Sequence, residues 1–303
     1  MRMAAVAMAI YCGLAALAAA PALAQAPNPY LAAAQQAKDL SFPDKPSAFS
    51  LFSSPEMALY KPDGPGPFPA LVLHHQCGGL RANNWQNQSM LQWARTAVAH
   101  GYVALVIDSL GPRGVSSVCM GVQGGVHFPR GARDELQAVE HLRKFDFVDK
   151  KRIAVAGYSW GAMVAVYGSS QAIGAALAPG ERFAAAVAFY PGCATIKPPA
   201  GNPYEIARPD IDRPLLVLMG SADNETPAQE CVSRLEPAKA AGAPVEWHVY
   251  PGVSHCWDCK NLNNFSKTDV RGNQVTYRYD EAVTQDSERR MFEFLDRAMA
   301  VAR

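Results

Sequence analysis

A serine between two glycines is the strongest candidate for a reactive side chain in this sequence. The segment GYSWG places Ser159 two residues from both Gly157 and Gly161. The apolar run RIAVAG before it predicts a strand, and WGAMVAVYGSS after it predicts a helix. A serine at such a corner presents its Oγ for nucleophilic attack, and the positive end of the helix dipole favours a developing oxyanion. On its own, the motif is equally compatible with a plain glycine turn.

A serine nucleophile needs a general base and an acid that orients the base. The segment PLLVLMGSADNETP supplies Asp223 just after a predicted strand, and VEWHVYPGVSH supplies His255 after the next one. Both follow Ser159 in the order serine, acid, histidine that accompanies a nucleophile at a strand–turn–helix corner. We therefore predict a catalytic triad of Ser159, His255 and Asp223.

Other residues near these positions compete for the same roles. Glu225 and Asp258 are rival acids, and Asp223 itself could instead cap a helix, although Thr226 could also do so. His248 lies within a predicted strand and is interpreted as structural.

The elements around these residues alternate along the chain. The predicted strands are 70–75, 102–109, 152–159, 182–192, 214–223 and 245–255, and the predicted helices are 28–40, 85–101, 132–145, 160–170, 226–242 and 279–300. Short apolar strands that alternate with helices predict an α/β fold: a doubly wound, mostly parallel sheet with helices on both faces. A long glycine-rich loop, 110–131, and the polar segment 259–278 interrupt this pattern, and the second is a candidate flap or hairpin.

The first 24 residues have the features of a signal peptide. Arg2 precedes an apolar run that ends in the small-residue site Ala22-Leu23-Ala24. We expect cleavage after Ala24, a single domain over 25–303, and a periplasmic or secreted protein; the alternative is an uncleaved membrane anchor. The formal net charge of +1 gives no indication of a nucleic-acid partner.

Five segments in order resemble the dienelactone hydrolase family of α/β-hydrolases. They are PALVLHHQCGGL, VALVIDSLGPRG, VAGYSWGAMVA, LMGSADNETP and YPGVSH, and the resemblance covers roughly residues 55 to 300. The family often has cysteine as its nucleophile, where this chain has Ser159; relatives with serine are esterases of broader range. The resemblance implies that the backbone amides of Cys77 and Trp160 form the oxyanion hole, and that no cofactor is needed.

The resemblance is less informative about substrate binding. Dienelactone-cleaving members hold a substrate carboxylate with two arginines. Arg113 loosely matches one of them, but CWDC follows the histidine where the other is expected, so a dienelactone substrate is not favoured. Arg113 either binds substrate or anchors its loop to backbone carbonyls. Trp257 is a second candidate for the substrate pocket, with core or rim packing as the alternative.

Six cysteines remain after the predicted signal, which contains Cys12. An even number of cysteines in an exported chain favours disulfides, with free thiols as the alternative. Placing the residues on the expected fold predicts three pairs: Cys77–Cys119, Cys193–Cys231 and Cys256–Cys259.

Two motifs also suggest other chemistry. HHQC could place His74, His75 and Cys77 on a metal, but adjacent residues of a strand point to opposite faces, so we predict no metal site. CWDC has the spacing of a redox motif, although a local disulfide is favoured.

These observations predict an exported serine hydrolase that cleaves a small carboxylic ester or lactone through an acyl-enzyme. We expect no nucleic-acid partner and no stable membrane insertion. The alternatives are a peptidase or acyltransferase with the same triad, and a non-catalytic binding protein of the same fold.

Overall fold

The computed structural model describes residues 31, 33–34, 38–82, 85–178, 180, 182–198 and 202–300. The predicted signal peptide and most of the segment 28–40 lie outside these residues. Within the described ranges, no helix combines the length and apolar character needed to cross a bilayer.

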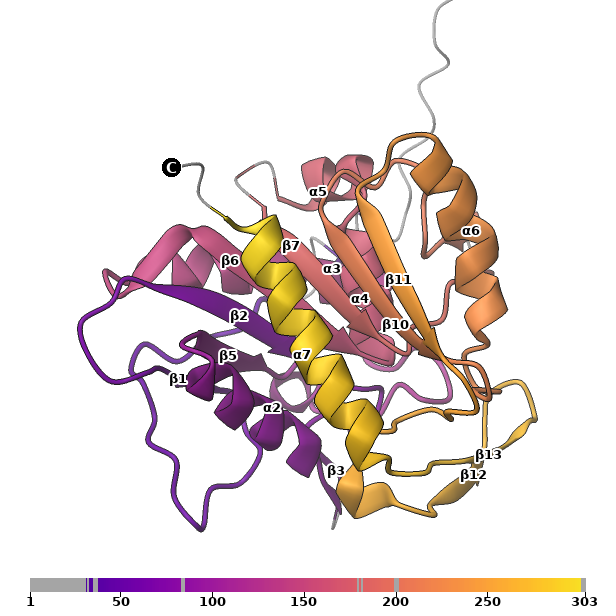
Figure 1. Ribbon diagram of the computed structural model, residues 1–303, viewed down its shortest axis with the longest axis horizontal. Helices are drawn as coiled ribbons and strands as arrows, with labels where there is room; N and C mark the ends of the chain where they lie inside the picture. The colour runs from indigo at the N-terminus through magenta and orange to yellow at the C-terminus, as the bar shows by residue number, and fades with distance from the viewer. Residues whose placement is uncertain are drawn as a thin grey trace, which may run out of the picture.

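A seven-stranded sheet forms the centre of the molecule (Figure 1). Its order is β1 (Ala58–Tyr60), β5 (Val103–Ile107), β2 (Phe68–His74), β6 (Val148–Tyr158), β7 (Ala185–Phe189), β10 (Leu215–Gly220) and β11 (Val245–Tyr250). Strand β1 pairs antiparallel with β5, whereas the remaining neighbours are parallel. The predicted mostly parallel sheet is therefore confirmed, and β1 is an edge strand that the sequence pattern did not reveal.

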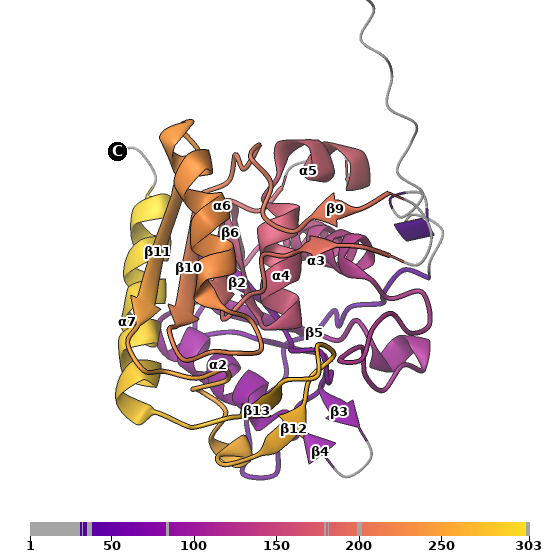
Figure 2. The same ribbon diagram turned by 90° about the vertical axis from the view of Figure 1, so that its right-hand side faces the viewer.

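Helices cover both faces of this sheet (Figures 1 and 2). One face carries α2 (Gln88–Ala99) and α7 (Glu281–Ala298), and the other carries α3 (Phe128–Leu142), α4 (Trp160–Gly168), α5 (Gln171–Leu177) and α6 (Ala228–Ala240). Each face has its own apolar core. Every residue of β5 and β7 is buried, because strands between two helical layers have no solvent face. The predicted arrangement, a mostly parallel sheet with helices on both faces, is confirmed.

Two predicted helices begin elsewhere in the structure. Helix α3 begins at Phe128 rather than 132, because His127 accepts a hydrogen bond from the Arg130 amide as N-cap and Pro129 fits the first turn. Helix α2 begins at Gln88 because the preceding residues form the short strand β4 (Trp85–Gln86), which pairs with β3 (Arg81–Ala82).

The polar segment 259–278 forms a hairpin, which is one of the two structures predicted for it. A short 3₁₀ turn, η2 (Lys260–Leu262), precedes the antiparallel strands β12 (Ser266–Thr268) and β13 (Gln274–Thr276). This β12–β13 hairpin lies beyond the carboxyl end of β11, beside β3 and β4 (Figure 2). A second small pair, β8 (Thr195–Ile196) and β9 (Tyr204–Glu205), follows β7.

Candidate active site

Ser159 lies on a strained corner between β6 and α4. Its φ of 51° and ψ of −109° are unusual for a residue with a side chain. The corner is tight because both flanking glycines lie against backbone atoms. A Cβ on Gly157 would lie 2.1 Å from the Gly161 carbonyl oxygen. A Cβ on Gly161 would lie 2.4 Å from the His74 carbonyl oxygen. Both glycines of GYSWG are therefore needed for the close packing of strand, corner and helix.

Three side chains form a continuous hydrogen-bonded chain at this corner. His255 Nε2 lies 3.0 Å from Ser159 Oγ, and His255 Nδ1 lies 2.7 Å from Asp223 Oδ2. The other carboxylate oxygen of Asp223 accepts hydrogen bonds from the amides of Glu225 and Thr226, each at 2.9 Å. Ser159, His255 and Asp223 follow β6, β11 and β10 respectively. The sheet thus brings together all three residues of the predicted triad at the carboxyl ends of its strands.

The charges around the three hydrogen-bonded side chains suit His255 to act as a base. Burial lowers the pKa of His255, but the negative charges of Asp223 and Glu225 outweigh burial and raise its pKa above the ordinary value. Burial raises the pKa of Asp223, but the His255 charge and hydrogen bonds from His255 and Thr226 hold it below the usual value. Asp223 is therefore a carboxylate that can stabilise the imidazolium of His255.

The rival acids have other partners. Asp258 accepts hydrogen bonds from Trp93 Nε1 at 2.8 Å and from the Tyr190 hydroxyl at 2.7 Å. Burial raises the pKa of Asp258. Glu225 approaches His255 at Nε2 rather than Nδ1, with 3.9 Å between Oε2 and the ring nitrogen. Neither acid is positioned to orient the base through Nδ1, as Asp223 is.

The hydrogen-bonded chain opens on a cavity of about 320 Å³. Its lining comes from the loop after β2, from β4, from the long loop after β5 and from the segment around the β12–β13 hairpin. The lining residues are Gln76, Cys77, Gly78, Trp85, Asn87, Ser117, Cys119, Ser159, His255, Cys256, Cys259, Asn261, Leu262, Phe265, Lys267 and Tyr277. The hairpin thus forms part of the wall that faces Ser159 and His255.

Of the two predicted oxyanion donors, Trp160 follows Ser159 in the chain and Cys77 lines the same cavity as Ser159. Trp160 is the first residue of α4, and Cys77 lines the cavity from the loop after β2. Within the part of the chain that the structure describes, neither of their backbone N–H groups donates a hydrogen bond. The Cys77 carbonyl accepts a hydrogen bond from the Val118 amide at 2.9 Å, which ties this loop to the long loop after β5. This agrees with the role of oxyanion donor that the family resemblance predicts for both N–H groups, and that role remains a prediction.

All three predicted disulfides are present in the structure. They are Cys77–Cys119, Cys193–Cys231 and Cys256–Cys259, with Cα separations of 4.8, 4.8 and 5.3 Å. The first links two loops that line the cavity, and the third follows His255 directly.

Removing the first disulfide should affect both stability and catalysis. In the double variant Cys77→Ala/Cys119→Ala we expect the free energy of unfolding to fall by about 2–5 kcal/mol and kcat to fall as well, since Cys77 supplies a predicted oxyanion amide. Cys193→Ala/Cys231→Ala is a matched control, because it spans 38 residues against 42 and lies away from the cavity. Urea unfolding and ester kinetics measure both effects. Equal losses of kcat in the two double variants would contradict a specific role for the Cys77 loop.

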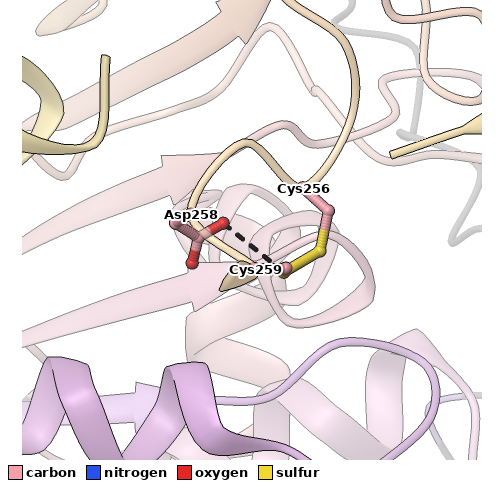
Figure 3. Close-up of side chains that lie close together, drawn as sticks. All are labelled: Cys256, Asp258 and Cys259. Carbon is pink, nitrogen blue, oxygen red and sulfur yellow. Dashed lines mark hydrogen bonds between the residues drawn. A yellow bond between two sulfur atoms is a disulfide. The ribbon is translucent and has the colours of Figure 1, made fainter. Parts of the chain in front are cut away.

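The two motifs that suggested metal or redox chemistry have structural roles here. In CWDC, the Sγ atoms of Cys256 and Cys259 are joined in a disulfide beside Asp258 (Figure 3), so neither is a thiolate that could bind a metal. In HHQC, both ring nitrogens of His74 are engaged, by Glu135 at 2.8 Å and by Ser109 at 3.0 Å.

The expectation that His74 and His75 point to opposite faces is wrong. Their ring centroids lie 5.2 Å apart, and both rings contact Trp160. The strand ends at His74, so the alternation of a regular strand does not extend to His75.

The structure places neither predicted substrate-binding residue on the cavity. Arg113 is almost fully buried and donates two hydrogen bonds to the Asp134 carboxylate, at 2.7 and 2.8 Å, and others to the carbonyls of Ser109 and Lys38. Arg113 therefore anchors its loop, which is the second of the two roles that the sequence predicts for it. Trp257 is fully buried in the core beneath α7, where its Nε1 donates to Ser287. We therefore correct both assignments.

The sequence analysis missed the residues that do line the far side of the cavity. Trp85, Leu262, Phe265, Lys267 and Tyr277 belong to it, and four of the five come from the segment 259–278. The feature of the sequence that could have indicated these residues is the unusual length of the segment 259–278.

Comparison with known proteins identifies the family. A model of the dienelactone hydrolase family matches residues 56–299. The chain belongs to the dienelactone hydrolase family. Membership of this family makes it a carboxylic ester hydrolase. A search of curated protein sequences gave no significant match.

Solved structures agree with the fold of this dienelactone hydrolase family member. An esterase from the planctomycete Thermogutta terrifontis, with propionate bound, is 18% identical, with a TM-score of 0.58 over 82% of this chain and 90% of that one. MGS-M1, an α/β-hydrolase enzyme from a deep-sea metagenome of the Medee basin, is 20% identical, with a TM-score of 0.55 over 77% of this chain and 86% of that one. At these identities, the likeness shows the α/β-hydrolase fold.

Proposed function

We propose that the protein hydrolyses small carboxylic esters or lactones through an acyl-enzyme on Ser159. The observation that carries this proposal is the hydrogen-bonded chain from Ser159 through His255 to Asp223, which opens on a cavity large enough for a small ester. A nucleophile, a base at Nε2 and an acid at Nδ1 are the groups that acyl transfer requires.

The proposed reaction has two halves. Ser159 Oγ attacks the ester carbonyl while His255 Nε2 takes its proton, and the amides of Cys77 and Trp160 bind the resulting oxyanion. The C–O bond to the alcohol then breaks, and His255 returns the proton to the departing alkoxide oxygen. Water, deprotonated by His255, then attacks the acyl group; the bond from the acyl carbon to Ser159 Oγ breaks, and His255 returns the proton to that oxygen as the acid is released. Throughout, Asp223 holds the ring and stabilises its positive charge.

A fluorophosphonate probe tests the proposal directly. We expect the folded protein to gain the mass of one adduct, and peptide mapping to place that adduct on Ser159, because only an activated serine reacts readily with such a probe. Protein unfolded in urea is the control and should gain none. Absence of an adduct on the folded protein, or an adduct elsewhere, would refute a serine acyl-enzyme.

The pH dependence of catalysis should reflect the raised pKa of His255. A protonated imidazole cannot accept the Ser159 proton, so kcat/KM should fall as the pH decreases through the pKa of His255 in the free enzyme. We expect the midpoint of this acid limb above the ordinary value of 6.5, because the charges of Asp223 and Glu225 raise the pKa. Glu225→Gln should move the midpoint to lower pH. A wild-type midpoint below 6.5 would contradict this assignment.

We also propose that the protein is exported and cleaved after Ala24. Three disulfides in a chain of this size support an oxidising compartment. N-terminal sequencing of protein recovered from the periplasm or medium should begin at Gln25. A product that retains Met1 and sediments with membranes would favour the uncleaved anchor instead.

A further inference from the structure

The charge balance of the cavity indicates which esters it accepts. Among the lining residues that the structure describes, Lys267 is the one lysine or arginine. Its charge therefore decides whether the cavity can attract a substrate that carries a carboxylate. This line of argument rests on the proposed function, since it concerns the substrate of the same site.

Lys267 is already neutralised by a partner within the protein. Its Nζ lies 2.7 Å from Glu225 Oε1, and the two side chains are only 20% and 14% exposed. The other oxygen of Glu225 accepts a hydrogen bond from the Tyr277 hydroxyl at 2.9 Å, and Lys267 Nζ lies 5.3 Å from the centroid of the Tyr277 ring. One acid thus holds the cation and the tyrosine of the β12–β13 hairpin together.

The location of Glu225 strengthens this effect. Its Oε2 lies 3.9 Å from His255 Nε2, the nitrogen that faces Ser159. The carboxylate of a bound substrate would therefore meet a fixed negative charge close to the reacting atoms. It would also lose its hydration without gaining an unpaired cation, which is unfavourable for an anion.

The remaining wall favours uncharged, apolar groups. Trp85, Leu262, Phe265 and Tyr277 contribute aromatic and aliphatic surface. The Phe265 side chain is 45% exposed, and its ring centroid lies 5.8 Å from that of Tyr277, which leaves an apolar ring accessible at the cavity wall. Neutral polar groups come from the amides of Gln76, Asn87 and Asn261, and from Ser117.

We infer that the enzyme selects uncharged esters with an apolar body, and that Glu225 excludes carboxylate-bearing esters by masking Lys267. The structure thus assigns Glu225 as a residue that determines specificity, in addition to the predicted triad.

Two substrate pairs of matched size test this inference. 4-Acetoxybenzamide and 4-acetoxybenzoate differ by one charge on the alcohol side; methyl 4-carbamoylbenzoate and monomethyl terephthalate differ by one charge on the acyl side. For each pair, the ratio of kcat/KM for the amide to that for the carboxylate is measured. Effects on the triad are common to both members and cancel in the ratio. We expect wild-type protein to prefer the amide by roughly tenfold or more in at least one pair, and a ratio near one in both would overturn the inference.

Variants of Glu225 and Lys267, the masking pair, measure how much this pair contributes to the ratio. Glu225→Gln frees Lys267 and should lower the ratio by roughly tenfold, whereas Lys267→Met leaves Glu225 uncompensated and should raise it. The double variant removes both charges and should restore a preference close to that of the wild type. An unchanged ratio in both single variants would overturn the inference. If Glu225→Gln does not fold, the wild-type ratio and Lys267→Met decide together: masking predicts a wild-type ratio above one that rises in the variant, whereas an unmasked Lys267 predicts a wild-type ratio below one.

The fluorophosphonate adduct separates this inference from the proposed function. Wild-type protein without an adduct on Ser159 would show that the proposed function has failed. An adduct with no discrimination between amide and carboxylate would show that the charge inference alone has failed.

Discussion

Replacing Ser159 with alanine should lower kcat/KM for a small ester by at least about 10⁴-fold, as expected when the nucleophile of a triad is removed. The Oγ of Ser159 lies 3.0 Å from His255 Nε2 and is the atom that would form the acyl-enzyme. Water attacking directly from the cavity could provide only the residual catalysis that comes from binding and the oxyanion amides.

The fold should survive this change, because the Ser159 backbone sets the corner and its amide donates to the Phe189 carbonyl at 2.9 Å. The midpoint temperature of thermal unfolding should therefore be close to that of the wild type. Ser233→Ala is a suitable control, since Ser233 lies on α6 and its hydroxyl donates to the Glu230 carbonyl of the same helix. If folded Ser159→Ala protein kept a tenth of the wild-type activity, a different nucleophile would have to be sought.

Replacing Gly161 with alanine should destabilise the whole fold by about 3 kcal/mol or more. The added Cβ would lie 2.4 Å from the carbonyl oxygen of His74 and 2.7 Å from that of His75. Both contacts are with backbone atoms, which cannot rotate away as a flexible side chain can. The Gly161 amide also donates to the His75 carbonyl at 3.1 Å, so α4 would have to move away from the loop that follows β2.

Gly168→Ala provides the matched comparison, because Gly168 ends the same helix and is also buried. A Cβ there meets nothing nearer than 3.6 Å, and alanine is the better helix former, so we expect little change or a small gain in stability. Urea unfolding of both variants measures the difference. Similar unfolding free energies for the two variants would contradict the prediction, because they would mean that α4 can shift to accommodate a Cβ at position 161.

The sequence predicted the positions of the triad because local pattern determines them. An alternation of apolar strands and helices fixes which loops follow strand ends, and parallel strands bring those ends to one edge. Ser159, Asp223 and His255 each follow such a strand, so their approach could be expected without coordinates. The Cys77–Cys119 pair followed from the same placement of loops at one edge, whereas the Cys193–Cys231 pair joins a strand end to the helix after the next strand and the Cys256–Cys259 pair is local in the sequence.

Features that depend on long-range partners could not be predicted in this way. Whether Arg113 binds a substrate or an internal acid depends on Asp134, in a helix whose orientation the pattern does not specify. Trp257 is adjacent to a disulfide that lines the cavity, yet the turn directs its ring into the core. Glu225 was considered only as a rival acid, since its contact with Lys267 requires the hairpin to fold back across 42 residues.

Two of the three disulfides line the cavity of the candidate active site, and this has a practical consequence for anyone who produces the protein. Cys77–Cys119 joins the loops that follow β2 and β5, and Cys256–Cys259 follows His255, so both cross-links lie beside the predicted triad. Production in a reducing cytosol would yield chains whose sheet can form but whose reactive edge lacks its covalent ties. The specific activity of such a preparation would then depend on the fraction of molecules whose disulfides have formed, as well as on the catalytic rate of the native enzyme. Production in an oxidising host, with thiol counting before any assay, avoids this confusion.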